Sequence, residues 1–97
     1  MPDFLLLMHN DTKADESPKL WELYLQSLRT IGAFVGGSAV GGGTTIRRFD
    51  IAAPLTTHVT GFIRITAKDL DEAKRLAEGN PVLEAGGTIE IRELIPD

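Results

Sequence analysis

The sequence contains no cysteine, which excludes disulfide bonds and thiolate chemistry. This absence is compatible with the reducing cytosol, and we expect a cytoplasmic protein. Long apolar runs are also missing. The stretch LLLM at residues 5–8 is far too short to span a bilayer, and no basic segment precedes it as in a signal peptide. We therefore expect no membrane partner.

The sequence has fewer basic than acidic residues. It contains ten Lys and Arg residues and 14 Asp and Glu residues, so the net charge is −4 at neutral pH. Non-specific binding to nucleic acid needs a basic face, and Arg47, Arg48 and Arg64 are too few to form one. The sequence predicts no nucleic-acid partner.

The chain of 97 residues has the length of one domain, which we place at residues 1–97. Its 42% hydrophobic and 25% charged residues are ordinary for a globular protein. A chain this short buries a modest fraction of its surface, which favours further burial through oligomerisation.

The last third of the chain predicts a strand, a helix and a second strand. Residues 58–66 are rich in β-branched and aromatic side chains, and they alternate between two faces. Asp69 and Glu72 then have the spacing of a capping box, and Gly79 is placed to end the helix. Residues 80–85 are expected to be irregular, and a strand is predicted over residues 88–94. Strand, helix, strand is half of a ferredoxin-like unit.

The first third predicts another strand and helix. Residues 3–9 read DFLLLMH, with apolar side chains on both faces, as in a central strand. A second protomer covering one face would explain this, although the strand could also pack incompletely against its own loops. Ser17 and Pro18 predict a helix start, and Gly32 predicts its end.

The segment FVGGSAVGGG at residues 34–43 contains five glycines. A phosphate-binding loop would need a following lysine and helix, and both are missing here. Residues 44–49, TTIRRF, instead resemble a strand, so we expect one bent strand or two between residues 34 and 49.

The resulting order predicts an α+β fold of ferredoxin-like βαββαβ type. We expect an antiparallel sheet with strands in the order 4-1-3-2 and both helices on one face. The bare face would pack on a second copy, which gives a homodimer, or a higher oligomer, that forms a dimeric α+β barrel.

Polar residues are expected to converge at one end of this sheet. The first strand ends at His9 and its neighbour begins at His58, with Asp11, Tyr24 and Asn80 close by. Polar groups beside an apolar sheet are typical of a ligand pocket. In this hypothesis His58 is a catalytic base with Tyr24 as hydrogen-bond donor, while His9, Asp11 and Asn80 bind the ligand.

Each of these residues also has a structural interpretation. The histidines could be solvated strand ends, Asp11 a turn residue, Tyr24 a core residue and Asn80 a helix exit. A metal site of His9, His58 and Asp11 is chemically acceptable, but the spacing does not support it, and we predict no metal and no cofactor.

A serine hydrolase is a further alternative that the sequence disfavours. Ser17 has the position of a helix cap, and Ser38 lies in a glycine run without the strand–turn–helix elbow of a nucleophile.

Four segments of the chain resemble the YCII-related family, specifically its DGPF-type branch. They are the opening MPDFLLLMHND, the glycine-rich GGSAVGGG, the strand HVTGFIRI and the ending DLDEAKRLAEGNPVLEAGGTIEIREL. The resemblance covers nearly the whole chain, and its most specific part is the strand–helix–strand ending. It implies a dimeric α+β barrel built from ferredoxin-like protomers.

The resemblance also implies a site at which this chain departs from the family. Some members carry a histidine on the first helix and an aspartate before a proline, and these positions correspond here to Tyr24 and Asn80. Neither residue is a good general base near neutral pH. The DGPF motif is also missing, and its shortened equivalent, IAAPLTTH, keeps Pro54. His58 or His9 would have to supply the base.

Two functional hypotheses follow. In the first, the protein is an enzyme that transfers a proton, or eliminates a group, on a small organic molecule. In the second, it is a non-catalytic dimeric module that binds a small molecule or a protein and lacks the family's dyad.

Overall fold

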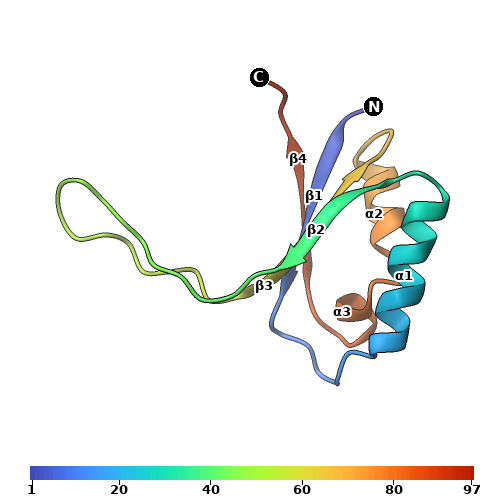
Figure 1. Cartoon of the computed structure of the whole chain (residues 1–97), viewed down its shortest axis with the longest axis horizontal. Helices are drawn as coiled ribbons and strands as arrows, with labels where there is room; N and C mark the ends of the chain where they lie inside the picture. Colours follow the sequence, from blue (N-terminus) through green and yellow to red (C-terminus); the bar gives the residue numbers. More distant parts are fainter.

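The computed structural model describes all 97 residues as an α+β fold with one antiparallel sheet. The strands lie in the order β2-β3-β1-β4, and the helices cover one face, which leaves the other face of the sheet open (Figure 1). The predicted strand order is confirmed, and the arrangement is compatible with a ferredoxin-like fold. The elements are β1 (Asp3–His9), α1 (Pro18–Thr30), β2 (Phe34–Ala39), β3 (Val59–Thr66), α2 (Leu70–Ala77), α3 (Pro81–Glu84) and β4 (Ile89–Leu94).

The central strand β1 divides its side chains between the two faces of the sheet. Phe4, Leu6 and Met8 are buried in the core against the helices, whereas Leu5 and Leu7 are half-buried on the open face. This alternation is the ordinary period of a strand. The open face therefore carries apolar side chains that no part of the same chain fully covers.

Side-chain caps fix the helix starts as the sequence predicts. The Ser17 hydroxyl accepts a hydrogen bond from Leu20 N, and the Asp69 carboxylate accepts one from Glu72 N at 2.9 Å. One expectation was wrong: the segment after Asn80 is a short helix, α3, because the Asn80 side chain caps it and Pro81 follows at its first position.

The expected strand over residues 44–49 was also wrong. Residues 41–57 form a protruding arm that leaves the sheet between β2 and β3 and returns (Figure 1). A strand needs a partner to satisfy its backbone groups, and the pairing of β2 with β3 ends at Ala39 and Gly61, before the arm. Asp50 turns the chain at a φ of 82°. We define this segment as the arm.

None of the three helices has both the length and the apolar character that crossing a membrane would require.

Candidate functional site

An apolar hollow of about 420 Å³ lies between α1 and the β2–β3 side of the sheet. Trp21, Leu25 and Arg29 line it from α1, where their spacing of four residues places them along one side of the helix. The strands opposite contribute Gly37, Ala39 and Gly61. The hollow exists because these three strand positions have little or no side chain to fill the space. We call it the α1 hollow.

Two contacts fix polar side chains that line the α1 hollow. The Trp21 indole N–H donates a hydrogen bond to Glu16 Oε1 at 2.9 Å. The Arg29 guanidinium lies over the Phe34 ring, 4.8 Å from its centroid, in a cation–π contact. Arg29 forms no salt bridge within the chain, so its charge is available to a ligand. Sequence reasoning missed this hollow, although the glycines opposite the apolar stripe of α1 were a signal for it.

His9 and His58 lie together, as the strand order predicts. Their ring centroids are 4.7 Å apart and their planes are inclined at 76°, so the two imidazoles meet edge to face. His9 is the last residue of β1, and His58 directly precedes β3. The backbone fixes this meeting, because Asn10 N donates to His58 O at 2.9 Å.

Glu90, on β4, is the third member of this cluster. Its Oε1 lies 3.2 Å from His9 Nε2, where a protonated nitrogen donates to the carboxylate. Its Oε2 accepts a hydrogen bond from Arg92 at 3.1 Å. The hydrogen bonds from Arg92 and then His9 hold the pKa of Glu90 below its ordinary value. We call His9, His58 and Glu90 the histidine cluster.

Asp11 lies near the histidine cluster, but both of its carboxylate oxygens are engaged by Thr88. Its two carboxylate oxygens accept hydrogen bonds from the hydroxyl of Thr88 at 2.6 Å and from Thr88 N at 2.8 Å. The hydroxyl bond and then the backbone bond lower the pKa of Asp11. The carboxylate therefore clamps the loop after β1 to the start of β4.

Tyr24 is a core residue with 5% of its surface exposed. Its hydroxyl donates to the Leu76 carbonyl at 2.6 Å, which satisfies one of the free carbonyls at the end of α2. Burial raises the pKa of Tyr24 to about 12, against an opposing effect of the neighbouring Asn80 side chain. The phenol therefore stays protonated near neutral pH.

Asn80 is fully buried as the cap of α3. Its Oδ1 accepts from Val82 N at 2.9 Å, whereas its Nδ2 has no hydrogen-bond partner. The carbonyl oxygen is thus used to start a helix, and Asn80 lies with Tyr24 on the helix side of the sheet.

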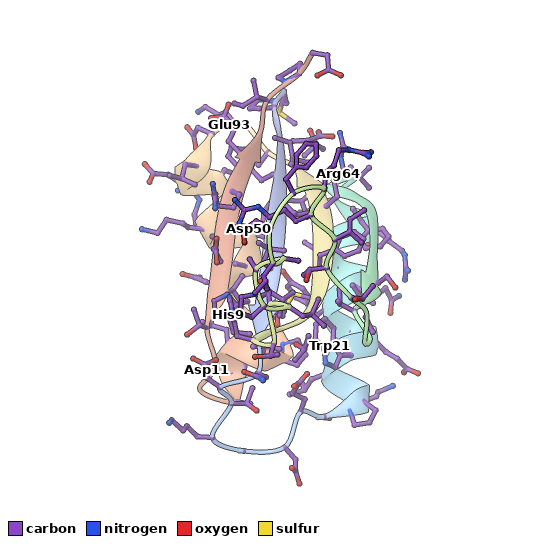
Figure 2. All side chains as sticks on the ribbon, turned by 90° about the vertical axis from the view of Figure 1, so that its left-hand side faces the viewer. His9, Asp11, Trp21, Asp50, Arg64 and Glu93 are labelled. Atoms are coloured by element: carbon purple, nitrogen blue, oxygen red, sulfur yellow. The ribbon has the colours of Figure 1, made fainter.

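The expected convergence of all five residues into one pocket does not occur. His9 alternates with Met8 along β1, and it lies on the open face that Figure 2 views directly. Tyr24 belongs to the core that contains Met8. His9 and His58 thus lie together, whereas Tyr24 and Asn80 are buried on the helix side of the sheet, so the five residues do not share one pocket.

Comparison with known proteins found no match to this chain among protein-family models or among curated proteins.

Tyr24→Phe should lower the free energy of unfolding by about 1–2 kcal/mol, because it leaves the Leu76 carbonyl without its partner. Urea denaturation measures this change. Thr30→Ala is the matched control, because it removes an exposed hydroxyl bonded to the Gln26 carbonyl, and its effect should stay within about 0.5 kcal/mol. Equal effects of the two substitutions would contradict the structural role of Tyr24.

Proposed function

We propose that this protein is a cytoplasmic homodimer that binds a small, largely apolar organic anion in the α1 hollow. The observation that carries this proposal is the hollow itself. Its volume of about 420 Å³ lies within the range of small-molecule pockets, roughly 300–1,000 Å³. Aromatic and aliphatic side chains of α1 form one wall, and polar groups are few.

The surroundings of Arg29 support a ligand that is negatively charged. Its guanidinium is held against Phe34 and has no acidic partner in the chain. An arginine in this state can receive a carboxylate or a similar planar anion through two parallel hydrogen bonds. The apolar interior would hold the body of the ligand while its charged end stays at the mouth.

The residues around the hollow favour binding over acid–base chemistry. Its lining contains no histidine, and its single carboxylate, Glu16, accepts a hydrogen bond from Trp21. Tyr24 is engaged with Leu76 in the core. Proton transfer by His58 stays a prediction, and it would belong to the histidine cluster on the other face.

The homodimer is supported by the open face and the arm. Leu7 and Phe62 are paired across β1 and β3 on the open face, where both stay half-buried. On the arm, Ile46, Phe49 and Ile51 are 93%, 79% and 85% exposed. The radius of gyration is 14.8 Å, against roughly 12–13 Å for a compact domain of this length. A second copy would cover both apolar regions, as in a dimeric α+β barrel.

Membership of the YCII-related family is part of the same proposal. The order of helices and strands and the order of strands in the sheet both agree with what that resemblance implies. The departures at Tyr24 and Asn80 support a member that binds a ligand without the family's acid–base dyad.

The hollow can be tested with 1-anilinonaphthalene-8-sulfonate, an apolar aromatic anion. The chain has one tryptophan, and it lines the hollow, so energy transfer from Trp21 reports binding there. Ala39→Phe should abolish the transfer by filling the space. Arg29→Gln should weaken binding roughly tenfold, because a charge-assisted hydrogen bond contributes more than about 1.4 kcal/mol.

Arg75→Gln is the matched control, because it removes an exposed positive charge of α2 that does not line the hollow. Circular dichroism checks that each variant is folded. Binding that Ala39→Phe leaves intact would contradict the proposed site, and so would equal effects of the two arginine substitutions.

Phe62→Glu should convert the homodimer to monomers, because it places an unpaired charge on the apolar open face. Sedimentation velocity at micromolar concentration measures the change. Leu20→Glu adds the same charge to an exposed apolar position of α1, away from the open face, and should leave the dimer intact. A native protein that sediments as a stable monomer would contradict the proposal.

A further inference from the structure

Three strands of the sheet bring two imidazoles and a carboxylate to one place on the open face. One ligand atom from each of His9, His58 and Glu90 lies within 4.8 Å of the other two. These are the only two histidines in the chain. Positions 9, 58 and 90 are remote in sequence but adjacent in the fold. None of the three residues lines the α1 hollow or belongs to the buried core.

The distances approach those of a metal site. Zinc binds imidazole nitrogen and carboxylate oxygen at about 2.0–2.2 Å, so two ligands of a tetrahedral ion lie about 3.3–3.6 Å apart. His9 Nε2 and Glu90 Oε1 are already 3.2 Å apart. All three ligand atoms lie within 4.8 Å of one another, so an approach of about 1 Å brings the set to this spacing, and rotation of the exposed His58 imidazole can supply it.

The backbones that carry the three side chains are fixed. His9 N donates to Thr88 O at 3.0 Å, which ties the end of β1 to the start of β4. Asn10 ties residues 57 and 58 to β1, because its backbone N–H donates to His58 O and its side-chain Nδ2 donates to Thr57 O at 3.1 Å. The cluster thus has the rigid support that metal ligands require.

Glu90 also has an outer hydrogen-bond partner, Arg92, of the kind that orients carboxylates in metal sites. Arg92 holds Oε2 at 3.1 Å, and this leaves Oε1 to face His9. Such outer contacts orient the ligand atom and keep the carboxylate ionised. Asp11 does not compete for the ion, because Thr88 occupies both of its oxygens.

We infer that His9, His58 and Glu90 bind one divalent transition-metal ion, of which zinc is the best match. Two imidazoles and one carboxylate suit zinc and its neighbours, whereas magnesium and calcium prefer oxygen ligands alone. Three protein ligands leave one tetrahedral position for water or another molecule, as in open zinc sites. This inference rests on residues of one chain and does not depend on the α1 hollow.

Isothermal titration of the tag-free protein with ZnCl₂ tests the site, and titration with CoCl₂ adds the visible absorption of tetrahedral cobalt. We expect one ion per chain. His9→Gln, His58→Gln and Glu90→Gln should each weaken binding by more than about tenfold, because even the loss of an outer partner costs about 10- to 100-fold.

Glu93→Gln is the matched control, because it removes an exposed carboxylate of the same strand that lies outside the cluster. It should leave both affinity and the cobalt spectrum unchanged. Circular dichroism confirms the fold of each variant. The inference is overturned by absence of binding, by one ion per two chains, or by binding that survives His58→Gln or falls equally in Glu93→Gln.

Discussion

The pairing of β1 with β3 determines which side chains of these strands face the core and which face the open side of the sheet. Its register places Leu6 opposite Ile63 in the core and Leu7 opposite Phe62 on the open face. A shift of one residue in either strand would turn its core side chains toward the open face and its open-face side chains toward the core. At the end of the pairing a register shift between Met8 and His9 sets His9 opposite Val59, the residue after His58. The core and the apolar open face therefore depend on one alignment of two strands, and the histidine cluster depends on the register shift at the end of that alignment.

Small residues on β2 and β3 account for the α1 hollow and for the close pairing of these two strands. Gly37 and Gly61 lie on the helix side of β2 and β3, where a larger side chain would occupy the α1 hollow. Neither could easily be replaced, because an added Cβ would lie 2.6 Å from the Phe62 carbonyl at Gly37 and 3.1 Å from the Ser38 carbonyl at Gly61. The close strand pairing and the hollow thus have the same cause.

The sequence predicts what depends on local chemistry, such as the caps at Ser17 and Asp69, and the strand order brings the histidines together. It does not show whether a segment finds a partner, so TTIRRF resembles a strand although residues 44–49 belong to the unpaired arm. Tyr24 and Asn80 were predicted to share a pocket with the histidines, whereas both are buried on the helix side of the sheet. Glu90 could have been found, since the predicted strand order sets β4 beside β1, with Glu90 on the histidine face.

The central claim is that the sheet separates two binding sites, an apolar one under α1 and a polar one on the open face. NMR of one sample, titrated first with 1-anilinonaphthalene-8-sulfonate and then with Zn²⁺, tests it most directly. The organic anion should shift the Trp21 indole N–H and leave both imidazoles unchanged, while Zn²⁺ should shift both imidazoles and leave the indole unchanged. A shift of all three signals by either ligand alone would contradict the claim.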